Sequence, residues 1–301
     1  MSKIIHYFYD DVDIWKKGKA SQFRMCYASW LRYCPDYEIK LWHTGMPEFS
    51  RILNDSEFVR ECYKRKLWAF IADYVRYYAL YHYGGIYLDT DIQLVKGLDE
   101  FVNKPFFCSI EGDFYKHGNI PEPALIGGQK GHKIFRDILD IYNSDKIFSI
   151  EHFIANIVLG NYLNENFNFN SINYPDNLKE KAENYYRQPP SYQLEDYELY
   201  RNQQVTKLDG IDAEIYPSEY FCPTWTAFKE KAFTENTVAI HWNQSSWWGN
   251  SRAVRRVIAL KYKNPFARFC FIHSGRLVRL VTCFIPFKAW RKKIRAFASL
   301  R

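Results

Sequence analysis

The chain lacks the sequence features of a secreted disulfide protein, a metal–thiolate protein and an integral membrane protein. Its seven cysteines are scattered over 301 residues, their number is odd, and no CxxC pair occurs. Because no signal peptide is visible either, we expect mostly buried, free thiols in a reducing compartment such as the cytoplasm. No stretch reaches about 18 uncharged apolar residues, so we expect no transmembrane helix. Repeats and low-complexity linkers are absent as well, which favours one domain with additions.

Acidic residues are missing from the last part of the chain. Residues 251–301 hold 14 Lys or Arg and no Asp or Glu, whereas the whole chain has a net charge of +7. The preceding residues 1–250 therefore carry 7 − 14 = −7, an acidic body before a basic tail. Apolar and basic side chains alternate in the tail, so we expect an amphipathic helix on an anionic membrane surface. Nucleic-acid binding, which we do not expect, and a helix docked on the acidic body are the alternatives.

Strand and helix patterns alternate over the first 95 residues. We expect strands at 3–9, 37–42 and 86–95, the last of which ends or bends at the acidic pair within it. We expect helices at 20–33 and, bent or in two pieces, at 56–83. This order predicts an α/β fold with a mostly parallel sheet. Later patterns predict a strand at 104–112, a turn and helix at 124–143, and two short strands at 213–223 and 236–248.

The segment 143–209 has a different composition, rich in Asn, Tyr, Glu and Gln, with little strand pattern. We expect a helical insertion or a mobile lid there. The predicted organisation is a domain of residues 1–250 that contains this variable segment, followed by a basic helical extension of residues 251–301.

Two carboxylates one residue apart, Asp89 and Asp91, end the apolar run of "YGGIYLDTDIQL" (83–94). Open α/β sheets bind their ligands at the carboxyl ends of strands. While the backbone stays extended, both side chains point the same way, and neither tolerates burial without a cation. Mg²⁺ or Mn²⁺ prefers such oxygens and bridges to phosphates, so the pair predicts a metal–diphosphate site. A surface turn is the alternative for so short a motif.

Three further residues are candidates for the same site. Asp73 and Arg76 stand three apart in a helix that is apolar nearly all round, which favours a buried pair over a surface ion pair. Arginine suits phosphates or sugar hydroxyls, and aspartate suits sugar hydroxyls. His241 follows an apolar strand, so it is either a third metal ligand, favouring Mn²⁺, or a core histidine.

The stretch "AFIADYVRYYALYHYGGIYLDTDI" (69–92) resembles the DxD-containing sugar-transfer region of glycosyltransferase family 32. That family includes capsule and lipopolysaccharide glycosyltransferases, fungal initiating mannosyltransferases and, distantly, large glucosylating toxins. The resemblance runs in order over residues 3–248, apart from 143–209. It implies a GT-A-like fold, Mn²⁺ or Mg²⁺, a nucleotide-sugar donor (a UDP-sugar above all) and transfer with retention of configuration.

The resemblance also implies roles for catalytic and metal-binding residues. Asp89 matches the first DxD carboxylate, expected near the ribose, the sugar and the metal. Asp91 matches the second, a direct metal ligand, and His241 is the candidate third ligand. Asp73 and Arg76 match the pair that holds the donor sugar and its phosphates.

Five other residues are expected to bind the donor. Gly84 and Gly85 match the family's Gly–Gly pair. Tyr9 stands where relatives often have a tryptophan that stacks on uracil, and this departure weakens the prediction of the base. Ser246 and Trp247 lie in the block that closes over the diphosphate.

Together these features predict a retaining, metal-dependent glycosyltransferase. It would move a hexose or N-acetylhexosamine to a cell-surface polysaccharide or lipid-linked glycan, at the inner face of the cell membrane. No Asp or Glu stands out as a general base. Glu111, just after the apolar run of the strand at 104–112, either faces the acceptor or, as we expect, lies at the surface. The alternatives are a phosphohydrolase with an aspartyl nucleophile, disfavoured by Gln93 two residues after the second Asp, and a non-catalytic peripheral membrane protein.

Overall fold

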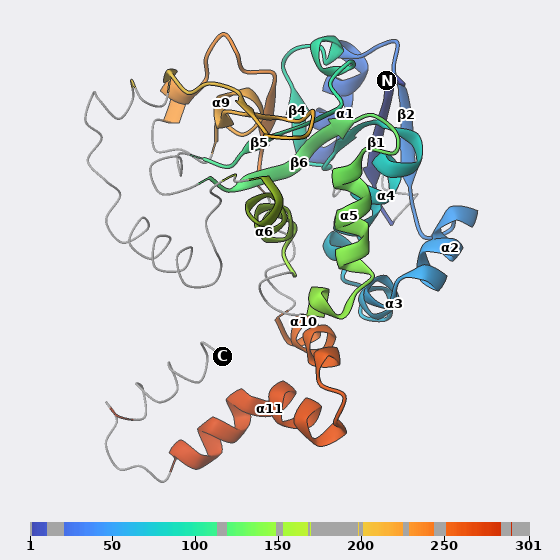
Figure 1. Cartoon of the computed structure of the whole chain (residues 1–301), viewed down its shortest axis with the longest axis vertical. Coiled ribbons are helices and arrows are strands. Elements are labelled where there is room, and N and C mark those ends of the chain that lie inside the picture. Colours follow the sequence, from blue (N-terminus) through green and yellow to red (C-terminus); the bar gives the residue numbers. More distant parts are fainter. Residues whose placement is uncertain are drawn as a thin grey trace.

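A computed structural model describes residues 2–10, 21–112, 119–148, 153–167, 169, 198, 201–224, 229–243, 251–283 and 290. In these residues a seven-stranded sheet has the order β2-β1-β3-β6-β5-β8-β7 (Figure 1). Its strands are β1 (Ile4–Phe8), β2 (Glu38–Trp42), β3 (Gly85–Leu88), β5 (Phe106–Ile110), β6 (Pro121–Gly128), β7 (Thr206–Lys207) and β8 (Glu214–Tyr216).

The sheet is mixed, with mostly parallel strands. β2, β1, β3, β5 and β8 share one direction, while β6 and β7 run the opposite way. A second sheet pairs β4 (Ile92–Leu94) with β9 (Ala239–His241) in antiparallel fashion. The predicted GT-A-like α/β fold, a mixed and mostly parallel sheet flanked by helices, is confirmed.

Helices cover both faces of the large sheet because side chains alternate along its strands. On one face, Tyr87 and Phe106 join a core built with α2 (Pro47–Asp55), α3 (Glu57–Lys64), α4 (Trp68–Tyr83), α5 (Lys133–Tyr142) and α6 (Ala155–Phe167). On the other face, Ile86 and Phe107 pack with α1 (Ser21–Tyr33), the small sheet and α9 (Ser218–Phe221). The small sheet therefore lies on the face opposite α4.

Glycines fix the passage from α4 into β3. Gly84 caps α4 at φ 67°, and its N–H donates to the carbonyl of Leu80 over 2.8 Å. Gly85 has φ 105°, and a Cβ added there would lie 2.6 Å from the carbonyl oxygen of Ile4. The predicted C-terminal cap is therefore confirmed, and the second glycine lets β3 lie against β1.

One local prediction was wrong. Residues 121–128 form the fully buried strand β6, where only a turn before the helix was expected. The prolines and glycines of "PEPALIGG" disguise this strand, since both residue types argue against one. The prediction that the strand ends or bends at the carboxylate pair is confirmed, because β3 ends at Leu88 and a turn leads into β4.

The C-terminal part begins inside the body. Val257 and Ile258 of α10 (Ser251–Ile258) are buried in the same core as α4, so the predicted boundary at residue 250 cuts through packed structure. A short 3₁₀ turn (Ala259–Lys261) follows, and then α11 (Pro265–Thr282) extends from α10 (Figure 1). No helix of the described residues is long and apolar enough to cross a membrane. Within 143–209, the described α6 confirms a helix.

Candidate active site

The turn after β3 brings the two aspartates to different sheets. The Asp89 N–H donates to the carbonyl of Ala124 on β6 over 2.8 Å, and the Ile92 N–H donates back to the Asp89 carbonyl over 3.0 Å. β4 then pairs with β9 so that Ile92 lies opposite His241. As a result Asp89 stays at the carboxyl end of β3, while Asp91 lies beside His241.

Asp89, Asp91 and His241 form one cluster. One ligand atom from each lies within 4.8 Å of those of the other two, and His241 Nε2 is 3.4 Å from Asp91 Oδ1. Two carboxylates and one imidazole suit a first-row divalent ion such as Mn²⁺. The donor set therefore fits the predicted metal, and the imidazole that the sequence left open as a ligand or a core residue faces the aspartates.

The imidazole of His241 is surrounded by acidic groups. Burial lowers its pKa, but the charge of Glu122 and the hydrogen bonds to Asp91 and Cys222 outweigh burial, so the pKa is raised well above its usual value. In the protein without a cation, His241 is therefore charged and pairs with Asp91.

Arg76 holds Asp89 from behind. Its Nη2 donates to Asp89 Oδ1 and Oδ2 over 2.9 and 3.1 Å and lies 3.3 Å from Asp73 Oδ1. The side chain is only 3% exposed, and its guanidinium lies over the ring of Tyr87, 5.0 Å from the ring centroid. The predicted burial is confirmed for Arg76, whereas the side chain of Asp73 is 16% exposed. Because the guanidinium is committed to two carboxylates, its contact with a donor phosphate stays a prediction.

Burial dominates the acidity of the two carboxylates around Arg76. It raises the pKa of Asp73 to about 7 and that of Asp89 to about 6, although the charge of Arg76 lowers both. A bound cation would favour the ionised form of Asp89 in the same way as Arg76 does.

The two glycines predicted to bind the donor are not brought to this cluster. Gly84 and Gly85 stand at the start of β3, and Asp89 follows its end. Four strand residues span about 13 Å. In the structure the glycines serve the helix cap and the contact of β3 with β1, and their predicted part in donor binding stays a prediction.

Tyr9 lies at the correct edge of the sheet. It follows β1, which runs parallel to β3, so it shares the carboxyl edge with Asp89. Its ring is stacked on Phe23 at 5.7 Å and 14°, a support for an aromatic platform. Ser246 and Trp247 lie outside the described residues, and their predicted roles remain predictions.

Sequence inspection missed several polar residues behind His241. Glu122 Oε1 accepts from the Ala124 N–H over 2.9 Å, and its Oε2 accepts from Asn156 Nδ2 over 3.2 Å. The same amide donates to Glu111 Oε2 over 2.9 Å. Burial and the charge of Glu122 raise the pKa of Glu111 to about 8. Glu111 is half-buried beside Asn156, so it is not the fully exposed residue that was expected. A glutamate inside the apolar run of 120–128 was the one available signal.

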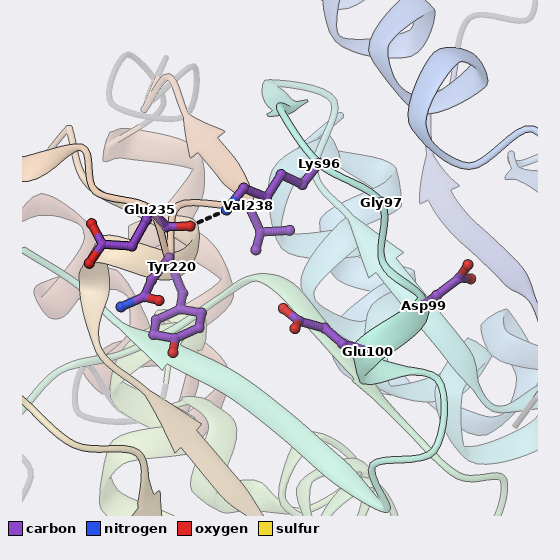
Figure 2. A pocket seen from close by; sticks show the side chains of 8 residues that line it. Lys96, Gly97, Asp99, Glu100, Tyr220, Glu235 and Val238 are labelled. Atoms are coloured by element: carbon purple, nitrogen blue, oxygen red, sulfur yellow. Dashed lines mark hydrogen bonds between the residues drawn. The ribbon is translucent and has the colours of Figure 1, made fainter.

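A hollow of about 280 Å³ opens elsewhere (Figure 2). Its rim is largely acidic, and the Lys96 ammonium donates to the Glu235 carbonyl across it. It shares no residue with the cluster, so we do not assign it to the site. Its lining consists of Lys96, Gly97, Asp99, Glu100, Tyr220, Glu235, Asn236 and Val238.

Part of the chain is similar to known proteins. Residues 20–107 match a protein-family model described as "Glycosyltransferase sugar-binding region containing DXD motif". The matched residues include Asp73, Arg76, Asp89 and Asp91, so the predicted resemblance is confirmed for a glycosyltransferase region of this type. The narrower assignment to family 32, and to its capsule and lipopolysaccharide members, stays a prediction.

Two curated relatives match part of the chain. Mannosyl phosphorylinositol ceramide synthase SUR1 of Saccharomyces cerevisiae is 34% identical over 116 residues, 35% of this chain and 26% of the relative. Inositol phosphoceramide mannosyltransferase 3 of Schizosaccharomyces pombe is 36% identical over 105 residues, 34% and 28% of the two chains. The chain thus spans about a quarter of the length of these relatives. A solved structure named "PaToxG Glycosyltransferase" has a TM-score of 0.41 at 16% identity, covering 55% of this chain and 68% of its own.

Proposed function

We propose that the protein is a metal-dependent glycosyltransferase that moves a hexose or N-acetylhexosamine from a nucleotide-sugar with retention of configuration. One observation carries the proposal above the others. Asp89, Asp91 and His241 converge within 4.8 Å at the edge of the sheet, inside or beside a region similar to DXD-containing sugar-binding regions.

The residues present fit a division of labour. Asp91 and His241, with Asp89, would hold the cation, which when bound supplies positive charge for a diphosphate leaving group. Arg76 keeps Asp89 oriented, since both carboxylate oxygens accept from its guanidinium. Tyr9, whose ring is stacked on Phe23, would contribute an aromatic contact to the nucleobase.

The same contacts argue against an aspartyl-nucleophile phosphohydrolase. Arg76 restrains Asp89 through both carboxylate oxygens, which suits a fixed ligand better than a nucleophile that must reorient toward a phosphorus atom. Asp91 Oδ1 in turn faces the imidazole of His241. The cluster is better suited to binding a cation than to forming a phosphoaspartate.

The names of the two relatives refine the donor sugar and the acceptor. Both names refer to mannose and to inositol phosphoceramide, a lipid. We therefore place mannose first among the hexoses, and a lipid-linked acceptor ahead of a cell-surface polysaccharide. A UDP-sugar remains the donor that the resemblance implies, and the departure at Tyr9 makes the base a question for experiment.

A membrane-bound acceptor agrees with the exposed apolar side chains of α11. The outer face of α11 is mostly apolar, because positions 266, 269, 277 and 280 fall on one side of an α-helix, with His273 between them against Phe269. This face comprises Phe266, Phe269, Leu277 and Leu280. The opposite side of α11 faces α10 and the residues after it. Arg255 Nη1 of α10 donates to Ser274 Oγ over 3.0 Å, and Phe271 contacts Tyr262, just after the 3₁₀ turn, with ring centroids 5.4 Å apart.

We infer that α11 lays this face on an anionic membrane at the cytoplasmic side. Residues 251–301 contain no acidic residue to oppose lipid headgroups, and exposed Phe266 and Leu280 would enter the interface. A chain ending at Lys263 keeps the buried α10 and removes α11. It should no longer sediment with phosphatidylserine vesicles while keeping nucleotide release, and unchanged sedimentation would refute this part.

A donor screen tests the enzymatic proposal. UDP- and GDP-linked hexoses and N-acetylhexosamines are incubated with the full chain and Mn²⁺, and free nucleoside diphosphate is measured. We expect release from one donor class, loss of release with EDTA, and loss in Asp91→Asn although that variant stays folded. No release from any donor, or full release by Asp91→Asn, contradicts the proposal.

A further inference from the structure

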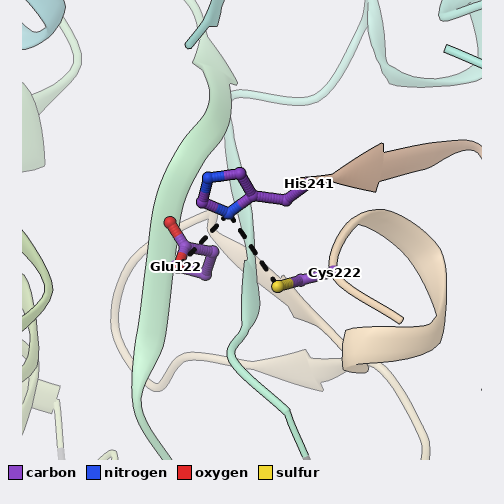
Figure 3. A group of neighbouring side chains, drawn as sticks. All are labelled: Glu122, Cys222 and His241. Carbon is purple, nitrogen blue, oxygen red and sulfur yellow. Dashed lines mark hydrogen bonds and ion pairs between the residues drawn. The ribbon is translucent and has the colours of Figure 1, made fainter. Parts of the chain in front are cut away.

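The two ring nitrogens of His241 face different carboxylates. Nε2 lies 3.4 Å from Asp91 Oδ1, toward the predicted cation. Nδ1 lies 3.8 Å from Glu122 Oε2 and 4.0 Å from Cys222 Sγ, on the other side of the ring (Figure 3). One edge of the imidazole therefore belongs to the cluster, and the other faces buried groups that nothing so far connects with function.

Glu122 is held firmly in its place. The side chain is buried on β6, and a buried carboxylate is costly unless hydrogen bonds compensate for its lost water. Neutral donors do so here: the Ala124 N–H serves Oε1 over 2.9 Å and the Asn156 amide serves Oε2 over 3.2 Å. Among the described residues, the ion pair recorded for Glu122 is with His241.

Cys222 is the weaker of the two partners of Nδ1. A thiol is a poor donor and a poor acceptor, whereas a carboxylate is a strong acceptor for an imidazole N–H. Its sulfur is also approached by Asn243 Nδ2 at 3.9 Å, so the thiol is not dedicated to the histidine.

We propose that Glu122 is the positioning residue of the metal site, keeping the proton of His241 on Nδ1 so that Nε2 is presented to the cation beside Asp89 and Asp91. A carboxylate behind a ligating imidazole fixes the tautomer and the ring orientation and strengthens the ligand. The inference rests on the metal site of the proposed function, and it concerns a residue that is not itself a ligand there.

The proposal also gives a role to the variable segment 143–209. Asn156 comes from α6 within that segment, and its amide bridges Glu111 and Glu122. Thus α6, through Asn156, holds Glu122 in place, Glu122 orients His241, and His241 would bind the cation. A segment outside the family resemblance completes the back wall of the site.

Mn²⁺ binding to the full chain tests the inference without requiring turnover. The dissociation constant is measured from the free Mn²⁺ signal in electron paramagnetic resonance. Coordination by imidazole is followed through the ¹⁴N modulation of the electron spin echo. Glu122→Gln should weaken binding by about 10- to 100-fold and reduce the nitrogen modulation.

Two variants serve as controls. Glu111→Gln changes the other carboxylate on Asn156 and should leave Mn²⁺ affinity within about twofold, since Glu111 makes no ion pair with His241 among those recorded. Cys222→Ser should do the same. Circular dichroism establishes that each variant is folded.

The outcomes separate this inference from the proposed function. Wild-type affinity and nitrogen modulation in Glu122→Gln overturn the positioning role and leave the metal site intact. Equal loss in Glu111→Gln, or loss confined to Cys222→Ser, also overturns it. Absence of Mn²⁺ binding by the wild-type chain refutes the metal of the proposed function, and this inference with it.

Discussion

Replacing His6 with glutamine is expected to make the protein less sensitive to acid. His6 is fully buried, and Trp42 Nε1 donates to its Nδ1 over 3.1 Å. Because an indole N–H can only donate, Nδ1 must accept, and the ring proton lies on Nε2, which faces the Gly84 carbonyl at 2.9 Å. The imidazole is therefore neutral in the folded protein, with no room for a second proton.

The magnitude follows from the shift in acidity. Burial lowers the pKa of His6 from 6.5 to about 4, although the hydrogen bond to Gly84 opposes this. A depressed folded-state pKa means that the unfolded chain binds the proton first, so this contribution is complete above pH 6.5 and is lost as the pH falls toward 4. Between pH 7.5 and pH 5 the wild-type protein should lose about 2 kcal/mol of stability through this residue.

Urea denaturation of both proteins at the two pH values measures this effect. Other titrating groups are shared and cancel in the comparison, so the stability difference between wild type and His6→Gln should shrink by about 2 kcal/mol at pH 5. A difference that is the same at both pH values would show that His6 has the same pKa in the folded and unfolded states, and the tautomer argument would be wrong.

Three further changes test other parts of the structure. Gly85→Ala should lower the free energy of unfolding by more than about 3 kcal/mol, because the added Cβ would lie 2.6 Å from a carbonyl oxygen. Gly131→Ala, also at positive φ but in open space, should lower it by about 1–2 kcal/mol. Urea denaturation measures both values, and equal losses would contradict this expectation. Arg76→Lys keeps the positive charge but loses the two hydrogen bonds to Asp89. We therefore expect Mn²⁺-dependent nucleotide release to fall about 10- to 100-fold. Unchanged release would show that Arg76 does not orient Asp89. Mn²⁺ at 100 times its dissociation constant should stabilise the wild-type chain by about 2.7 kcal/mol and leave Asp91→Asn unaffected in thermal unfolding; equal stabilisation would place the ion elsewhere.

The sequence predicted the parts of the fold that local chemistry determines. The apolar periodicity of 68–83, the capping Gly84 and the apolar run after it specify α4 and β3 with little tertiary help. The strand β6 escaped prediction because prolines and glycines contradict its local preference. Its glycines are required by packing instead, since a Cβ on Gly127 would lie 2.5 Å from the ring of Phe107.

The sequence predicted the two carboxylates of the candidate site, but it did not predict which residues contact and orient its histidine. Asp89 and Asp91 belong to one short motif, whereas their contact with His241 depends on the pairing of β4 with β9, which no local pattern encodes. Glu122 and Asn156 meet only because α6 packs on β6, and the sequence gives no register for that contact. Such convergence of distant residues is visible only in three dimensions.

Anomalous diffraction from crystals soaked with Mn²⁺ would test the central claim most directly. The account predicts one strong peak within coordination distance of Asp91 and of His241 Nε2, with Asp89 beside it, and no such peak in Asp91→Asn. A peak at another place, or none in crystals of a chain that releases nucleotide from its donor, would contradict the assignment of these three residues as the metal site.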